Sequence, residues 1–277
     1  MTKIKKMFAL APLCAALHVS ACGSGLNQDS NTKIVGGERV PIGEWRSTVA
    51  LTHPNGGVFC SGTALNRNLV VTAAHCLKGR TANDIKVYTG SGDFLNGAVG
   101  QYSVSRAVAS PKYKDVALRK DNDIAYLLLK TSIDYPDTSF VKVLTDPYEI
   151  KELLRPGAKT HLVGFGLRDS NRLGEKWQND TYIGIKDPKT WYNKKTEISV
   201  GGYSKDSCGG DSGGPAYGQL KNGQWRVYGV TSRGVGCGNG GVYGLIHANI
   251  CWILDETYID LGLPEGYCNG PELSSPL

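Results

Sequence analysis

Two short segments constrain the fold and chemistry of this 277-residue chain more than any other feature. Residues 210–215 read Gly-Asp-Ser-Gly-Gly-Pro, and residues 72–76 read Thr-Ala-Ala-His-Cys. A serine hydroxyl is a weak nucleophile at neutral pH, so a hydrolase that uses one needs a positioned base and hydrogen-bond donors for the developing oxyanion. Glycines around Ser212 leave its backbone amides free of neighbouring side chains. The two segments together indicate a serine nucleophile with His75 as its base.

A third segment lies between these two along the chain. Residues 121–125 read Asp-Asn-Asp-Ile-Ala and lead into an apolar run. The three segments, in the order His, Asp, Ser, resemble the active-site signatures of the chymotrypsin/trypsin family of serine proteases, whereas other serine hydrolases have other orders. The resemblance implies a catalytic triad in which His75 is the base, Asp123 orients the imidazole and Ser212 is the nucleophile. Asp121 is the alternative to Asp123, but the apolar run aligns with Asp123.

The same resemblance assigns roles to groups around Ser212. The amides of Gly210 and Ser212 would form the oxyanion hole, and the hydroxyl of Ser232 would lie close to the buried aspartate. A silent family member that serves as a binding module would lack a triad residue or have a broken Gly-Asp-Ser-Gly motif, and neither is found. The resemblance therefore implies an active peptidase.

Asp206 stands six residues before Ser212, where trypsin-like members of the family have the carboxylate at the floor of the specificity pocket. A buried carboxylate there is satisfied by a guanidinium or ammonium group, which selects Arg or Lys before the cleaved bond. Gly234 and Gly241 match pocket-wall positions where small residues leave room for a long side chain. The alternative is that Asp206 is a solvated loop acid.

Arg233 departs from the family pattern, which usually has an aromatic residue after the serine equivalent to Ser232. An arginine here could favour acidic or small side chains upstream of the cut. It could instead lean over the pocket and compete for Asp206, which would change the primary specificity. Both alternatives stay open at the level of the sequence.

Residues 34–37 read Ile-Val-Gly-Gly, follow Lys33 and resemble the family's activation junction. Cleavage after Lys33 would free the α-amino group of Ile34, which would then pair with the carboxylate of Asp211. A new cation buried beside a carboxylate can order loops and assemble an oxyanion hole. The uncleaved chain is therefore expected to be a zymogen. The alternative is that the segment only begins a first strand.

The chain begins with the features of a targeting segment. Residues 1–21 combine three lysines with a short apolar stretch over residues 7–16, which predicts a signal peptide. This stretch is too short to span a bilayer as a helix of the mature protein. The sequence therefore predicts an exported protein.

Residues 19–22 read Val-Ser-Ala-Cys and resemble a bacterial lipobox, in which Cys22 would receive a lipid. The alternative is an ordinary secretory signal that is cleaved after Ala21. In either case the enzyme is expected to be bacterial and either secreted or anchored by lipid to the envelope, with residues 22–33 as a propeptide linker. If Cys22 carries a lipid, cleavage after Lys33 would release the catalytic domain.

Eight cysteines suit an oxidising compartment. Cys14 lies in the signal segment and Cys22 in the lipobox-like motif, which leaves six cysteines and fifteen possible pairings. Three disulfides are expected: two implied by the family resemblance, Cys60–Cys76 and Cys208–Cys237, and the pair that then remains, Cys251–Cys268.

The formal net charge is +6, and the three lysines of residues 1–21 supply about half of it. A charge of about +3 on residues 34–277 is too small to argue for nucleic-acid binding. The sequence has no closely spaced Cys/His set and no nucleotide-binding loop, so no metal or other cofactor is expected. The expected partners are protein or peptide substrates and protein inhibitors; membrane attachment would come only from the lipid anchor, and the enzyme would be a monomer.

Short alternating or β-branched runs, separated by Gly, Asn and Asp, predict an all-β domain over residues 34–277. The expected strands lie at residues 48–52, 68–72, 85–89, 102–107, 124–129, 159–163, 225–231 and 241–246. The family resemblance implies two packed six-stranded antiparallel β-barrels with the triad in the cleft between them and a crossover within residues 132–156. It also implies a C-terminal helix, and residues 247–259 show helical spacing of apolar residues.

Overall fold

The computed structural model describes residues 34, 36–91, 100–116, 119–166, 175–184, 192–202, 204–234 and 236–269. The predicted signal peptide, Cys22 and Lys33 lie outside the described residues. Residues 31–277 form one unit by their internal contacts. None of the helices in the described ranges has both the length and the apolar character that crossing a membrane requires.

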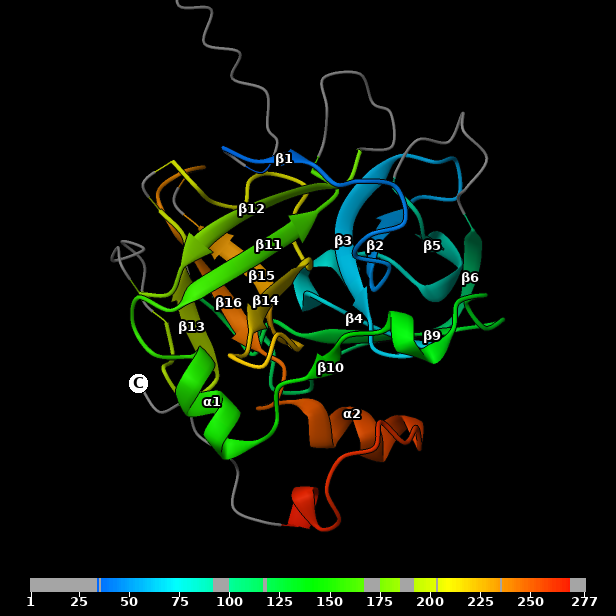
Figure 1. The fold of residues 1–277 in the computed structure, drawn as a ribbon. Helices are drawn as coiled ribbons and strands as arrows, with labels where there is room; N and C mark the ends of the chain where they lie inside the picture. The colour runs from blue at the N-terminus through cyan, green and yellow to red at the C-terminus, as the bar shows by residue number, and fades with distance from the viewer. Residues whose placement is uncertain are drawn as a thin grey trace, which may run out of the picture. The chain divides into compact units, whose positions relative to one another are not determined.

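The first barrel closes on itself through six antiparallel strands (Figure 1). Its strands are β2 (Thr48–Thr52), β3 (Val58–Ala64), β4 (Leu69–Thr72), β5 (Lys86–Tyr88), β6 (Gln101–Ala109) and β9 (Ala125–Leu129), paired in the order β2-β3-β4-β9-β6-β5. β4 reads Leu-Val-Val-Thr, a composition that suits a pleated surface, and it is buried at every position. Because this rigid strand ends at Thr72, it fixes the start of the histidine segment, residues 73–76.

The second barrel consists of β11 (Lys159–Gly164), β12 (Trp177–Tyr182), β13 (Glu197–Val200), β14 (Pro215–Gln219), β15 (Trp225–Gly234) and β16 (Gly241–Leu245). These strands pair in the order β12-β11-β14-β15-β16-β13. A bridge between Ile183 and Val200 joins the two ends of this order. Two short strands are added at its margins, β1 (Glu38–Arg39) beside β12 and β10 (Lys142–Val143) beside β15. The predicted all-β fold with two six-stranded barrels is confirmed.

In the part of the chain that the structure describes, two α-helices accompany the barrels (Figure 1). α1 (Pro147–Leu153) lies in the crossover and begins at Asp146, whose carboxylate accepts hydrogen bonds from two amides of the first turn. α2 (Ile250–Thr257) is the predicted C-terminal helix, shorter at both ends than residues 247–259. It stops because Tyr258 adopts a left-handed backbone with φ of 55°. The smaller elements are η1 (Ala74–Leu77), η2 (Ala82–Asp84), η4 (Asp137–Ser139), η5 (Tyr267–Asn269) and the hairpin of β7 (Lys114–Val116) and β8 (Arg119–Asp121).

The two barrels are joined by aromatic packing and by buried hydroxyl groups. Trp45, just before β2, stacks on Tyr217 of β14 and on His161 of β11, with 4.6 Å between ring centroids in each case. The Tyr217 hydroxyl hydrogen-bonds with the hydroxyls of Ser47 and Thr48 at 2.9 Å. These contacts hold β14, which follows the predicted nucleophile, against the strand that opens the first barrel.

The structure contains the disulfides Cys60–Cys76, Cys208–Cys237 and Cys251–Cys268, the same three pairs that were expected. The first joins β3 to η1, and the third joins α2 to η5. Disulfides that close loops of this size typically stabilise a fold by a few kcal/mol, mainly by restricting the unfolded chain. The first therefore supports the segment that carries the predicted base.

Lys176 is fully buried, and among the described side chains none forms an ion pair with it. Its ammonium group donates to the carbonyls of Trp45 at 2.9 Å and Glu44 at 3.4 Å, and it lies 5.3 Å from the centroid of the Phe165 ring. Burial lowers the pKa of Lys176 to about 7. Among the described groups, the charged lysine is therefore stabilised by carbonyl dipoles and an aromatic face, which do not fully replace water.

We expect Lys176→Met to raise the free energy of unfolding at pH 6 by on the order of 3 kcal/mol. Since the pKa of Lys176 is lower in the folded than in the unfolded chain, the charge destabilises the fold at acid pH, and this cost is lost as the pH rises from about 7 toward the unfolded value of 10.5. Urea unfolding between pH 6 and pH 10 measures how the difference in free energy of unfolding between the variant and the wild type decreases. Lys130→Met, at an exposed lysine, is the control. A variant less stable than the wild type at pH 6 would contradict the expectation.

Candidate active site

His75 and Asp123 meet where two paired strands of the first barrel end. Thr72, the last residue of β4, lies opposite Ala125, the first residue of β9, so the residues just beyond each are neighbours. The Nδ1 of His75 lies 2.8 Å from Oδ2 of Asp123, and the backbone amide of His75 donates to Oδ1 at 2.8 Å. Asp123 is completely buried. One carboxylate therefore fixes both the ring and the backbone of the histidine.

A third donor reaches Asp123 from the second barrel. The hydroxyl of Ser232, in β15, donates to Oδ2 of Asp123 at 2.6 Å. Asp121 lies instead in β8, paired with Lys114 across the hairpin. The left-handed backbone of Asn122, with φ of 50°, turns the chain between the two aspartates. The geometry thus brings Asp123, and not its alternative, to His75.

Ser212 lies in the tight turn before β14, and its backbone is anchored to the first barrel. Its carbonyl accepts a hydrogen bond from the amide of Ser61 at 2.8 Å. The next residue, Gly213, has φ of 81°, and a Cβ there would lie 2.1 Å from Oγ1 of Thr72. Sγ of Cys76 contacts both the carbonyl oxygen of Ser212 at 3.8 Å and Nε2 of His75 at 3.9 Å. Ser212 and the imidazole therefore flank the same sulfur atom.

Ser61 supports the turn that contains Gly210, and sequence reasoning did not single it out. Its hydroxyl donates to the carbonyl of Gly210 at 3.3 Å and accepts from the amide of Phe165 at 2.9 Å. Gly210 has φ of 87°, a conformation that glycine adopts most readily. The only sequence signal for Ser61 is its position beside Cys60, which is too general to indicate a role. This buried serine holds the backbone whose amides were predicted to bind the oxyanion.

The carboxylate of Asp211 is buried beneath this turn, with 2% of the residue exposed. It accepts hydrogen bonds from the amides of Gly166 and Cys208, each at 3.0 Å. A Cβ on Gly164 would lie 2.2 Å from its Oδ1, so the carboxylate occupies space that only a glycine leaves open. Burial, with a smaller effect from nearby Asp206, raises the pKa of Asp211 to about 7. Among the described side chains, none forms an ion pair with it.

Asp206 is likewise buried, with 2% of the residue exposed, so the alternative of a solvated loop acid is wrong. It accepts hydrogen bonds from the amides of Ser207 and Gly240, each at 2.8 Å. Burial raises the pKa of Asp206 to about 6. A Cβ on Gly241 would lie 3.7 Å from Oδ1 of Asp206. The disulfide of Cys208 with Cys237 joins the segment that follows Asp206 to the segment that precedes Gly240.

The side chain of Arg233 extends to Glu197 of β13. The guanidinium donates to both carboxylate oxygens, at 2.6 Å and 3.1 Å. Its Nη1 also donates to the carbonyl of Lys120 at 3.1 Å. These contacts argue against the idea that Arg233 leans over the pocket to neutralise Asp206. Glu197 was not identified from the sequence, where a single acidic residue 36 positions away gives no sign of the pairing.

A family model described as Trypsin matches residues 34–253. This chain belongs to the trypsin family. It is a serine endopeptidase with the trypsin-like double-barrel fold.

Curated relatives support this assignment. The chain is 29% identical over 253 residues to mouse "Atrial natriuretic peptide-converting enzyme", an alignment that covers 86% of this chain and 22% of the relative. It is 27% identical over 256 residues to "CLIP domain-containing serine protease B4" of Anopheles gambiae, covering 82% of this chain and 71% of the relative. The chain thus spans about a fifth of the first relative's length. Both are animal proteins, so they give no support to the expected bacterial source.

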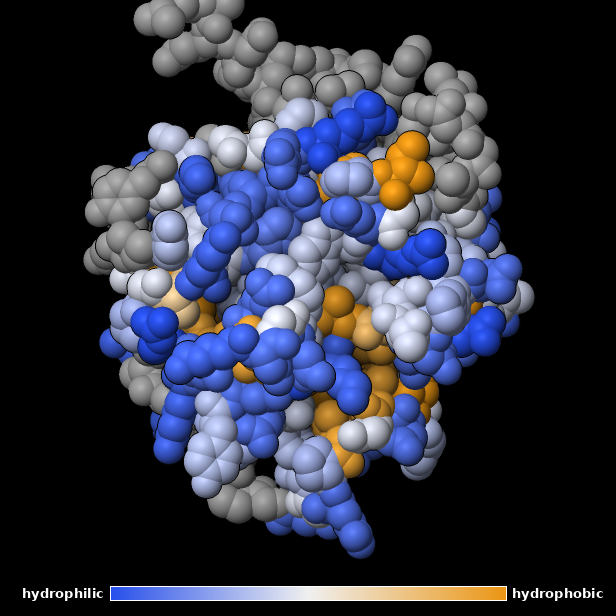
Figure 2. Space-filling model, viewed as in Figure 1, coloured by the Kyte–Doolittle hydropathy of each residue, from blue (hydrophilic) through white to orange (hydrophobic). Residues whose placement is uncertain are grey.

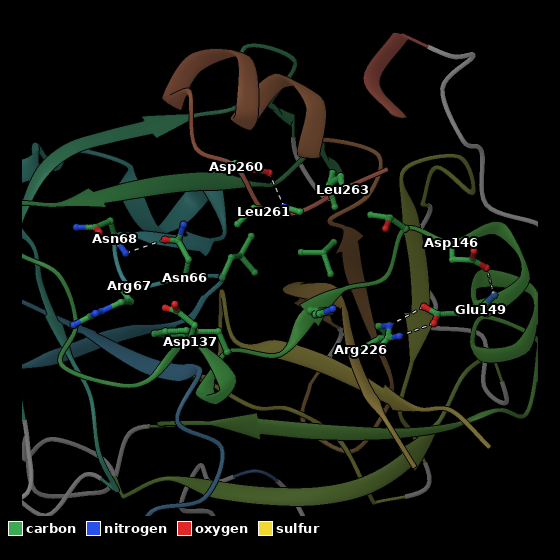
Figure 3. Close-up of a pocket in the computed structure, with 16 residues that line it drawn as sticks. Asn66, Arg67, Asn68, Asp137, Asp146, Glu149, Arg226, Asp260, Leu261 and Leu263 are labelled. Atoms are coloured by element: carbon green, nitrogen blue, oxygen red, sulfur yellow. Dashed lines mark hydrogen bonds and ion pairs between the residues drawn. The ribbon is translucent and has the colours of Figure 1, made fainter. Parts of the chain in front are cut away.

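A pocket of about 550 Å³ lies elsewhere on this trypsin-family enzyme (Figure 3). It is bounded by β10, by the start of α1 and by the C-terminal segment at residues 260–263, and it contains none of the predicted site residues. Figure 3 shows Arg226 and Glu149 directed toward each other, and their two hydrogen bonds measure 2.6 Å and 2.7 Å. Figure 2 shows apolar residues gathered near β10 and α2 on a face that is otherwise mainly hydrophilic. This pocket is therefore separate from the candidate active site.

One group of side chains beside the candidate active site contains atoms of the kind that bind metals. Within the part of the chain that the structure describes, Cys60, His75 and Cys76 form the one close group of potential ligands. Its two cysteines are joined in a disulfide, which removes the thiolates that a metal would need. The group therefore belongs to the surroundings of the histidine rather than to a metal site.

Proposed function

We propose that this trypsin-family endopeptidase cleaves peptide bonds after Arg or Lys through a triad of His75, Asp123 and Ser212. The observation that carries the proposal is the buried Asp123 carboxylate, which binds both Nδ1 and the backbone amide of His75. An imidazole held through Nδ1 has Nε2 as its basic atom. That atom lies 3.9 Å from the same sulfur that contacts the Ser212 backbone, which supports Ser212 as the group it activates.

The reaction follows from these positions. His75 removes the proton of the Ser212 hydroxyl as the oxygen attacks the carbonyl carbon, and the amides of Gly210 and Ser212 stabilise the oxyanion. The imidazolium then gives its proton to the leaving amine, and an acyl-enzyme remains. Water, activated by the same imidazole, hydrolyses the ester. Asp123 holds the tautomer throughout and stabilises the imidazolium.

The preference for Arg and Lys rests on Asp206. A carboxylate that is buried, accepts hydrogen bonds from neutral donors such as the amides of Ser207 and Gly240, and is raised in pKa is poorly solvated in the free enzyme. A guanidinium or ammonium group from the substrate supplies the missing counter-charge. Gly234 and Gly241 leave room for the long side chain, and the hydroxyl of Ser232 lies at the junction of the pocket with the triad.

The activation switch rests on Asp211. Its carboxylate is buried with two amide donors, and among the described side chains it has no cationic partner. Cleavage after Lys33 creates a new ammonium group on Ile34, whose side chain is itself buried at 2% exposure. Pairing of this group with Asp211 lowers the cost of the buried charge and stabilises the turn that presents Gly210.

Export and anchoring rest on residues 1–33 alone. The basic and apolar segment is read as a signal peptide, and Cys22 as the site of a lipid, which would make the source bacterial. Cleavage after Lys33 then activates the domain and releases it from the membrane in one step. The enzyme would act as a monomer on proteins or peptides and be subject to protein inhibitors.

Two forms of the enzyme test the proposal. One starts at Ile34, and the other keeps residues 23–33 and carries Lys33→Gln so that it cannot activate itself. We expect the first to hydrolyse an arginyl chromogenic peptide at least about 100-fold faster, because the second leaves Asp211 without a partner. Asp211→Asn in the first form should lower its activity toward that of the second.

Each part of the proposal has its own contrary outcome. Equal activity of both forms would overturn the zymogen switch. Fluorophosphonate labelling of Ser212 without cleavage after Arg or Lys would overturn the specificity and leave the triad intact. Retention of active, Ile34-started enzyme in the membrane fraction after a salt wash would overturn release by cleavage.

A further inference from the structure

We propose that the buried ion pair of Arg233 and Glu197 positions the aspartate of the triad. The inference rests on the proposed role of Asp123. It assigns a function to two residues of the second barrel that do not touch His75 or Ser212 in any hydrogen bond described above. Both would be positioning residues, which act on the reaction through Asp123.

Burial and hydrogen bonds restrict the positions of both side chains of this pair. Glu197 has no exposed side-chain surface, and the side chain of Arg233 is 8% exposed. The guanidinium binds the carboxylate in a two-pronged arrangement at 2.6 Å and 3.1 Å. Oε2 of Glu197 also accepts from the backbone amide of Asn193 at 2.7 Å. Since planar, two-pronged pairs have little rotational freedom, the position of the guanidinium is closely defined.

Two further hydrogen bonds connect this guanidinium to Asp123. The first runs from Nη1 of Arg233 to the carbonyl of Lys120 at 3.1 Å. Lys120 lies in β8, three residues before Asp123, and the chain between them passes through the left-handed turn at Asn122. The second barrel thus holds the backbone that leads into the catalytic aspartate of the first.

The second connection runs through Ser232. Its Oγ lies 3.3 Å from Nη1 of Arg233, which can only donate, and 2.6 Å from Oδ2 of Asp123. Nη1 carries two hydrogens and its shorter bonds go to Glu197 and Lys120, so Ser232 shares one of these hydrogens at the longest distance. The carboxylate of Asp123 can only accept, so the hydroxyl proton points at Asp123, and the guanidinium holds the Ser232 oxygen from the other side.

Stability alone does not require a charged pair at this place. Replacing a buried ion pair with apolar residues of similar volume is often neutral or stabilising, whereas removing one partner leaves a costly buried charge. An apolar pair could fill the same volume, but it could not donate to Lys120 and Ser232. The hydrogen bonds to these two acceptors are what the arginine adds.

The test is the double variant Arg233→Met/Glu197→Met, made in the Ile34-started enzyme. It removes both charges together, so no unpaired buried charge remains to unfold the protein. We expect a thermal midpoint equal to or above that of the wild type, a kcat for an arginyl peptide lowered about 10-fold or more, and a KM changed less than 3-fold. The rate at which a fluorophosphonate labels Ser212 should fall by the same factor as kcat.

The matched control is Arg226→Met/Glu149→Met. This pair is also two-pronged, through Nε and Nη2 at 2.7 Å and 2.6 Å, and its arginine lies in the same strand β15. It lines the remote pocket, so its removal should leave kcat and the labelling rate unchanged.

Two results would overturn the inference. An Arg233→Met/Glu197→Met enzyme with wild-type kcat and labelling rate would show that the pair is only structural. A change confined to KM would place Arg233 in substrate binding instead. Failure of the proposed triad can be distinguished from failure of this inference, because the wild-type enzyme itself would then resist labelling at Ser212.

Discussion

Replacing Ser212 with alanine is expected to lower kcat for an arginyl peptide by about 10⁶-fold, to a level set by substrate binding and oxyanion stabilisation alone. The substitution removes one oxygen atom and leaves the turn intact, because Ser212 is anchored through its carbonyl to the amide of Ser61 and the neighbouring Gly213 amide donates to Thr231. Single-turnover and steady-state assays on enzyme that starts at Ile34 measure the loss. Thermal unfolding should show no decrease in stability.

A second substitution tests whether His75 and Ser212 act together in one step or contribute to catalysis independently. His75→Ala should cost about as much as Ser212→Ala, and the double variant should be little worse than either, because base and nucleophile act in the same step. Additive losses would mean that His75 does not activate Ser212. A Ser212→Ala enzyme that keeps more than about 1% of wild-type activity would mean that another group is the nucleophile.

The strands that could be predicted from the sequence are those with clear alternating or β-branched runs. Residues 48–52 match β2 at both ends, and each of the other expected strands is present with neither end shifted by more than three residues. Four of the barrel strands, β3, β12, β13 and β14, were not predicted. β3 contains Ser61 and Gly62 in a fully packed wall, and β14 begins at Pro215 and contains Gly218, so both lack the usual signal.

The residues of the proposed triad could be singled out from the sequence because each lies in a contiguous motif. The partnership of Arg233 with Glu197 could not, because it depends on the register in which β13 and β15 both pair with β16. The same is true of Ser61, whose role arises only when β3 packs against the turn that contains Gly210. Local sequence identifies reactive side chains, whereas their supports are set by strand pairing between distant segments.

Replacing Asp206 with asparagine is expected to lower kcat/KM for arginyl and lysyl substrates by about 10²–10⁴-fold. The change removes one charge from a buried site without changing its shape, and a guanidinium would then be buried without a partner. Labelling of Ser212 by a small uncharged fluorophosphonate should continue at a rate close to that of the wild type, because the probe does not use the pocket floor. If arginyl and uncharged substrates lost activity equally, Asp206 would support the loop rather than the specificity.

Measurements of stability and of pH dependence further distinguish a role of Asp206 in specificity from a role in supporting its loop. Burial raises the pKa of Asp206 to about 6, above its ordinary value, so the folded protein binds more protons than the unfolded chain between about pH 4 and pH 6 and loses stability as the pH rises. Asp206→Asn should therefore raise the free energy of unfolding of the substrate-free enzyme at pH 7 by about 1–2 kcal/mol. In the wild type, kcat/KM for arginyl peptides should fall below pH 6 more steeply than for uncharged peptides, because protonation of Asp206 removes the counter-charge that only the cationic substrate needs. A variant that is more stable, still labelled at Ser212 and inactive on arginine can have lost only the counter-charge for its substrate.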